Sequence, residues 1–163
     1  MTYDFEAGLG VFVKAGVEFI LVGGVSAVAQ GAPVSTFDLD LVHARSPENI
    51  DRLLTVLEAM HAIFRMQPSR RLKPNRSHLS GFGHLNLMTD VGPIDLLCTI
   101  GRNLTYEDLL PDTDQLELGQ GLTVRVLRLE KLIDLKEQLN SEKDRAMLPI
   151  LRRTLEEKRR SGR

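Results

Sequence analysis

The chain has 163 residues, 42% of them hydrophobic, which is long enough for one domain with its own core. Its 21 Lys and Arg residues balance 22 Asp and Glu residues, and the formal net charge of −1 excludes a uniformly basic nucleic-acid-binding protein. The single cysteine, Cys98, excludes an internal disulfide framework and indicates a reducing compartment.

We expect one domain over residues 1–163, with a core over about 17–127 and C-terminal helices over about 128–160. The N-terminus is acidic where a secretory signal would be basic, and no stretch has the length of a membrane span. The sequence therefore predicts a cytoplasmic protein with no membrane partner. Cys98 lies in an apolar run, which predicts a buried hydrophobic residue and not a nucleophile.

An apolar run followed by a Gly-Gly pair predicts a strand, a glycine turn and a short helix near the N-terminus. The expected elements are a helix over Phe5–Ala15, a strand over Glu18–Val22 and a helix over Val25–Gln30. A helix that starts after Gly23 and Gly24 would direct free backbone N–H groups at an anion. Ser26, in the first turn, could hold a phosphate or only satisfy the helix end.

A second apolar run carries Asp38 and Asp40. Alternate side chains of a strand share a face, so the two carboxylates are expected on one side and Leu39 and Leu41 in the core. Two nearby carboxylates repel each other unless a cation lies between them, which indicates a divalent metal such as Mg²⁺. A solvated strand end is the alternative interpretation of this motif alone.

The middle of the chain begins with a well-marked helix after Ser46-Pro47-Glu48. The stretch from Ala59 to Thr89 then contains no Asp or Glu and is rich in basic residues. Its cations are Arg65, Arg70, Arg71, Lys73 and Arg76, with His78. This segment is typical of either a phosphate-binding surface or a solvated loop.

A hairpin is expected next, with strands over His84–Thr89 and Ile94–Ile100. Asp95 lies on the second strand and could join Asp38 and Asp40 if the strands are neighbours. A short helix over Tyr106–Leu110 and a small hairpin around Gly119–Gly121 are predicted to follow.

The C-terminal part is predicted to be helical. The Leu129–Leu139 helix has Lys136 on its apolar stripe, where a lysine usually reaches out to water. The stretch from Ser141 to Asp144 makes a good capping box, and Pro149 is expected to restart or kink the last helix.

At Gly23-Gly24-Val25-Ser26 and Ser35-Thr36-Phe37-Asp38-Leu39-Asp40-Leu41, the chain resembles the DNA polymerase beta-type nucleotidyltransferase superfamily, in particular its small bacterial minimal and abortive-infection-toxin-like members. The resemblance implies an α+β nucleotidyltransferase fold, in which a small mixed β-sheet is flanked by helices and followed by C-terminal helices. It also implies Asp95 as a third carboxylate, in Gly92-Pro93-Ile94-Asp95. Val34 stands where small members often carry a basic residue.

The resemblance implies transfer of a nucleoside monophosphate from an NTP to a hydroxyl acceptor. Asp38, Asp40 and Asp95 would be both the catalytic carboxylates and the ligands of Mg²⁺ or Mn²⁺, with Asp95 accepting the proton of the attacking hydroxyl. The residues implied to contact the nucleotide are Gly23, Gly24, Ser26, Thr36, Lys136 and Lys143.

The acceptor could be an RNA 3′ end, a protein or a small molecule, and the partner a cognate antitoxin or a second copy of the chain. A toxin–antitoxin component is one hypothesis. A catalytically inactive protein of the same fold that binds a nucleotide or a protein partner is another, and an ordinary α+β domain with a coincidental motif is a third.

Overall fold

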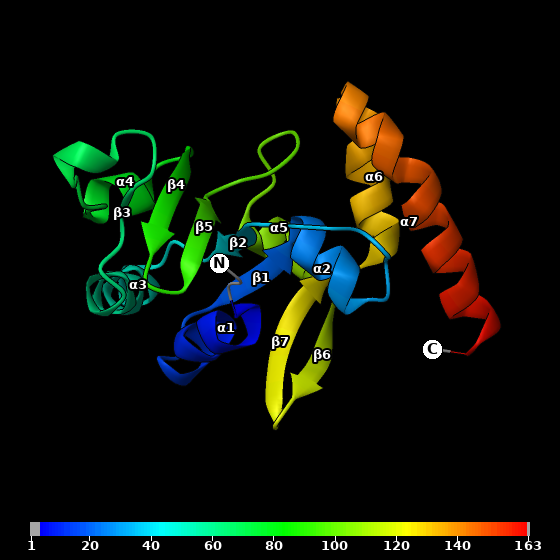
Figure 1. The fold of residues 1–163 in the computed structure, drawn as a ribbon, viewed down its shortest axis with the longest axis horizontal. Helices are drawn as coiled ribbons and strands as arrows, with labels where there is room; N and C mark the ends of the chain where they lie inside the picture. Colours follow the sequence, from blue (N-terminus) through cyan, green and yellow to red (C-terminus); the bar gives the residue numbers. More distant parts are fainter. Residues whose placement is uncertain (1–3, 163) are drawn as a thin grey trace.

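In the computed structural model, which describes residues 4–162, helices pack on both faces of a seven-stranded mixed sheet (Figure 1). The strand order is β3-β4-β5-β2-β1-β7-β6. The strands are β1 (Phe19–Val22), β2 (Leu39–His43), β3 (Ile63–Phe64), β4 (His84–Thr89), β5 (Gly92–Leu97), β6 (Thr113–Gly119) and β7 (Leu122–Leu127). Residues 1–3 and 163, the ends of the predicted domain, lie outside the described part.

The helices divide between the two faces. The α-helices are α1 (Phe5–Lys14), α2 (Gly23–Ala29), α3 (Pro47–Ala59), α4 (Arg76–Ser80), α5 (Tyr106–Leu109), α6 (Leu129–Leu139) and α7 (Glu142–Arg160), with 3₁₀ turns η1 (Pro68–Arg70) and η2 (Leu110–Asp112). Buried residues of α1, α3 and α4 form one hydrophobic cluster with the sheet. Those of α5, α6 and α7 form a second cluster on the opposite face, where α6 and α7 lie side by side (Figure 1).

The alternation of β2 and β5 decides which side chains face the second cluster. Leu39 and Leu41 of β2 and Ile94 and Leu96 of β5 are buried in the first cluster. Since neighbouring residues of a strand point to opposite faces, the intervening Asp40 and Asp95 face the side of the sheet that α6 and α7 cover in part. Burial of the leucines and isoleucine thus fixes the orientation of the two carboxylates.

The predicted α+β class is confirmed, as is the hairpin formed by β4 and β5. Two details near the Gly-Gly pair differ from the prediction. The helix begins at Gly23 itself, with no separate turn after β1, and Asp38 lies in a bend before β2 instead of in the strand. Asp38 and Asp40 therefore do not share a strand face by alternation.

At two other places the structure excludes one of the alternatives that the sequence left open. The segment after α3 is not an irregular loop, because it forms the short strand β3, a 3₁₀ turn and α4. The last helix does not restart at Pro149, because α7 continues through it from Glu142 to Arg160. Ser141 caps α7 through the predicted capping box with Asp144.

In the part of the chain that the structure describes, no helix has both the length and the apolar character needed to cross a membrane.

Candidate active site

Two carboxylates lie side by side on adjacent strands at the centre of the sheet. β2 and β5 are parallel neighbours, and Asp40 is in direct register with Asp95. Burial and the nearby Asp95 carboxylate, with a hydrogen bond between the two groups, raise the pKa of Asp40 to about 7. Asp38 raises this pKa further, whereas the positive charge of Lys143 lowers it. The three predicted carboxylates therefore form one electrostatic cluster, with Lys143 close enough to act on it.

Gly23 allows α2 to begin against Asp40. Its φ of +67° lies in the left-handed region, where a side chain is unfavourable. A Cβ at this position would collide with Asp40 Oδ2 and lie 3.0 Å from its Cγ. Since Val22 pairs with Asp40 between β1 and β2, the end of β1 carries the chain directly past the carboxylate. Gly23 is therefore required here for both its backbone conformation and its lack of a side chain.

Gly24 and Thr36 form a second contact of the same region. A Cβ on Gly24 would lie 2.7 Å from Thr36 Oγ1, so only glycine allows the hydroxyl to approach the helix start. The same hydroxyl lies 3.5 Å from the Asp38 carbonyl oxygen, to which it donates. The structure thus brings Gly23, Gly24 and Thr36 to the carboxylate cluster.

Ser26 lies elsewhere. It is fully buried, and its hydroxyl donates to the Leu127 carbonyl oxygen at 3.3 Å while accepting a hydrogen bond from Gln30 Nε2 at 3.1 Å. Its side chain thereby links α2 to the end of β7. Its role as a phosphate ligand stays a prediction, and this hydrogen bonding does not favour it.

The two predicted lysines differ in their surroundings. Lys136 Nζ lies 3.2 Å from Asp144 Oδ1, and this ion pair joins α6 to the start of α7. Lys143 is exposed, and its charge acts on Asp40. The structure therefore gives Lys136 a structural partner and leaves Lys143 as the lysine near the carboxylates.

Arg65 is a member of the cluster that the sequence assigned only to the general basic segment. Its Nη2 lies 2.9 Å from Asp95 Oδ1 and 3.8 Å from Asp38 Oδ2. Two other cations of this segment pair with acidic residues outside the cluster, Lys73 with Glu58 and Arg76 with Asp51. The sequence signal that could have found Arg65 is the apolar pair Ile63-Phe64 directly before it. A short strand at this pair places Arg65 beside the neighbouring strands of the sheet.

The carboxylates suit a divalent cation in donor type, since oxygen ligands are those that Mg²⁺ prefers. Among residues 4–162, however, no group of three or more His, Cys, Asp or Glu side chains is arranged as a finished metal site. The Arg65 guanidinium lies against two of the three carboxylates. The donor chemistry of the three carboxylates therefore fits the metal.

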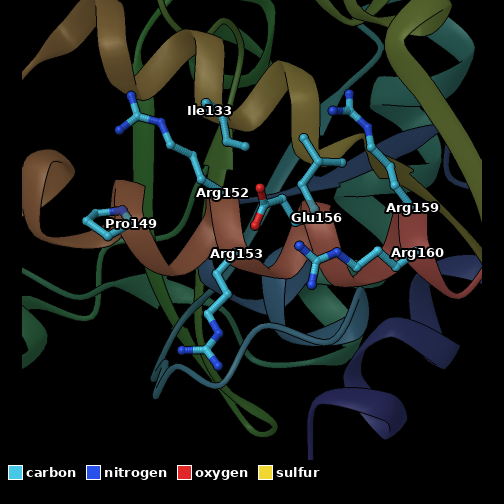
Figure 2. Close-up of a pocket in the computed structure, with 8 residues that line it drawn as sticks. Ile133, Pro149, Arg152, Arg153, Glu156, Arg159 and Arg160 are labelled. Carbon is cyan, nitrogen blue, oxygen red and sulfur yellow. The ribbon is translucent and has the colours of Figure 1, made fainter.

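A hollow of about 630 Å³ lies on α6 and α7 (Figure 2), and none of the predicted site residues lines it. Its lining includes four arginines of α7, which are Arg152, Arg153, Arg159 and Arg160. Arg152 pairs with Glu137 at 2.6 Å, Arg153 with Glu157 at 3.2 Å and Arg159 with Glu130 at 3.7 Å. Because acids neutralise most of these cations, the hollow is not a strongly basic surface.

Comparison with solved structures bears on the fold of the chain. The chain is similar to the crystal structure of a provisionally assigned nucleotidyltransferase from Thermotoga maritima, with a TM-score of 0.56 and 16% sequence identity. The match covers 94% of this chain and 91% of that one. The fold is the nucleotidyltransferase fold. No protein-family model and no curated protein sequence matches the chain.

At this identity the likeness shows the fold and leaves the reaction to the residues of this chain. It confirms the nucleotidyltransferase fold predicted from the Gly-Gly and Asp-Leu-Asp motifs. The narrower resemblance to toxin-like members stays a prediction.

Proposed function

We propose that the protein is a metal-dependent nucleotidyltransferase that moves a nucleoside monophosphate from an NTP to a hydroxyl acceptor. The observation that carries the proposal is the direct register of Asp40 and Asp95 on parallel strands, with Gly23 packed against Asp40. Clustered carboxylates beside a glycine-rich helix start suit a metal-bound triphosphate. The fold shared with the Thermotoga maritima protein also supports it.

The protein's own groups would divide the work between binding and proton transfer. Asp38, Asp40 and Asp95 would hold Mg²⁺ or Mn²⁺, which when bound neutralises charge on the triphosphate. Gly23 and Gly24 let Asp40 and Thr36 approach the start of α2 closely, and Lys143 adds positive charge near the carboxylates. Asp95, next to Asp40, would accept the proton of the attacking hydroxyl.

The acceptor class is part of the proposal. An RNA 3′ end, a protein hydroxyl and a small-molecule hydroxyl all present the same nucleophile to such a site. A toxin–antitoxin role, with a cognate antitoxin or a second copy as partner in the cytoplasm, is proposed on the resemblance of the motifs to small toxin-like members.

Incubation with each α-labelled NTP, Mg²⁺ or Mn²⁺, and total RNA or cell extract tests the transfer. We expect label on one class of macromolecule, lost in both Asp38→Ala and Asp40→Ala. Asp114→Ala is the matched control, because Asp114 is half exposed and pairs with Arg128 instead of the cluster. Absence of label with every NTP and acceptor, in protein shown to be folded, would contradict the proposal.

One observation favours a second candidate, a catalytically inactive protein that binds a nucleotide or a partner. Arg65 occupies the space between Asp38 and Asp95, where a catalytic site needs a divalent cation. Nucleotide binding in the absence of any transfer would favour this candidate. Asp40-dependent transfer would exclude it.

A further inference from the structure

Arg65 reaches the carboxylates because the β3–β4 pairing extends by one residue. Its backbone N–H donates to the Asn86 carbonyl oxygen at 2.9 Å, directly after the Phe64–Leu87 pair. Asn86 is in register with Asp95, and Asp95 with Asp40. Residues in register on adjacent strands share a face, so Arg65, Asn86, Asp95 and Asp40 form one row across the sheet.

The ion pair at the end of this row is shielded from water. Besides the 2.9 Å contact with Asp95 Oδ1, Arg65 donates from Nη1 to the Leu87 carbonyl oxygen at 3.4 Å. The Arg65 and Asp95 side chains are 27% and 15% exposed. Lys73 and Glu58, in the exposed pair nearby, are 63% and 69% exposed. Solvent and salt therefore weaken the Arg65–Asp95 attraction less than that of the other pairs in the basic segment.

This placement sets Arg65 in direct competition with a divalent cation. A guanidinium hydrogen-bonded to Asp95 Oδ1 occupies a lone pair that a metal would use, and its charge repels the metal. The same guanidinium lies 3.8 Å from Asp38 Oδ2, so it opposes metal binding at two of the three carboxylates.

We propose that Arg65 is a built-in counter-ion of the carboxylate cluster, which divalent cations enter only when its guanidinium leaves Asp95. The inference rests on the proposed function, because it assumes that the carboxylates bind metal. It makes Arg65 a positioning residue that sets metal affinity through Asp95 and Asp38.

The test is Mn²⁺ binding to nucleotide-free protein, measured by calorimetry for wild type and Arg65→Gln. We expect the variant to bind Mn²⁺ on the order of tenfold more tightly, because one competing charge is removed. Arg76→Gln is the control, since Arg76 pairs with the exposed Asp51 and should leave the affinity unchanged. In an Asp95→Asn background, Arg65→Gln should change the affinity much less, because the shared partner is gone.

A second measurement needs no folded Arg65→Gln variant. In wild-type protein with ¹⁵N-labelled arginine, the Arg65 Nε–H signal, assigned with Arg65→Lys, should shift as Mg²⁺ saturates the site. An Arg65 signal that stays constant through Mg²⁺ saturation would overturn the inference.

The outcomes separate the two proposals. If wild type binds Mn²⁺ through Asp40 and Arg65→Gln binds it equally or more weakly, the Arg65 inference is wrong and the proposed function stands. If neither protein binds Mn²⁺, both are wrong. Tighter binding by Arg65→Gln supports both.

Discussion

Strands β2 and β5 bring together two pairs of chemically reactive residues, and the pairs behave differently. Asp40 and Asp95 are in register on the two strands, whereas His43, the last residue of β2, lies close to Cys98, which directly follows β5. His43 Nε2 is 3.6 Å from Cys98 Sγ, and both residues are fully buried. Burial lowers the pKa of His43 and raises the pKa of the Cys98 thiol, so both are neutral near pH 7.

The carboxylate pair is partly exposed, and a cation already lies against it. A neutral buried thiol beside a neutral imidazole is inert, since only the thiolate is nucleophilic. The comparison teaches that reactive residue types form a candidate site where solvent can still reach them and a charged partner lies against them, and not where burial leaves them neutral. The following predictions test that distinction.

The largest effect is expected at Asp40. Asp40→Asn keeps the size of the side chain and removes its charge, so nucleotide transfer should fall by about 100-fold or more. Initial rates of label transfer at saturating NTP measure this. Asp114→Asn should retain the wild-type rate, and a similar rate for Asp40→Asn would show that the carboxylate pair is no more functional than the buried His43–Cys98 pair.

Stability should depend on pH through Asp40. Its pKa is raised from 3.8 to about 7 in the folded protein, so the folded state holds a proton that the unfolded chain releases. The associated stability is present below pH 3.8 and is lost as the pH rises through about 7. In the presence of a metal chelator, the free energy of unfolding of the wild type should fall by about 2–3 kcal/mol relative to that of Asp40→Asn between pH 5 and 8. Urea unfolding at each pH measures this difference.

The sign of this change is decisive. A wild-type protein that gains stability relative to Asp40→Asn as the pH rises would mean that Asp40 is well paired by a cation in the free protein. Arg65 would then neutralise Asp40 as well as Asp95.

Gly23→Ala should destabilise the protein by about 2–4 kcal/mol, because the added Cβ meets the Asp40 carboxylate and the backbone has positive φ. Gly121→Ala is the matched control. The φ of Gly121 is +76°, and an added Cβ would meet no atom within 4 Å. Gly121→Ala should therefore show only the conformational penalty of about 1 kcal/mol. If thermal or urea unfolding shows that Gly23→Ala and Gly121→Ala lose equal stability, the close approach of Gly23 to Asp40 is refuted.

Cys98→Ala should have the smallest effect. We expect the rate of nucleotide transfer to be unchanged. The free energy of unfolding should fall by about 1–2 kcal/mol, because the substitution removes the sulfur atom from a fully buried position. Thiol titration of native wild-type protein should be slow until it unfolds. A large loss of transfer in folded Cys98→Ala would give the His43–Cys98 pair a role that its burial argues against.

The sequence predicted the local features best where a strong local signal existed. The helix over Leu129–Leu139 and the capping box at Ser141 follow from periodicity and capping chemistry, and the structure has both. The Gly-Gly and Asp-Leu-Asp motifs similarly indicated the fold. These features depend on residues that are close in the chain.

The rest depended on tertiary contacts. The parallel register that places Asp95 beside Asp40 joins strands far apart in sequence, and no local pattern specifies it. Arg65 was hidden in a basic segment because its partners come from β2 and β5. The hydrogen bond of Ser26 could not be predicted for the same reason, since its hydroxyl donates to a carbonyl oxygen of β7 that local capping rules do not include.

The wide spacing of the cluster along the chain has a consequence for folding. Gly23, Asp40, Arg65, Asp95 and Lys143 come from five separate segments, and β1 pairs in parallel with β7 near the end of the sheet-forming region. Contacts between distant residues form late, because the intervening chain must first be ordered. A growing chain on the ribosome therefore lacks a complete cluster until the start of α7 has emerged, so any transfer activity requires synthesis at least as far as Lys143.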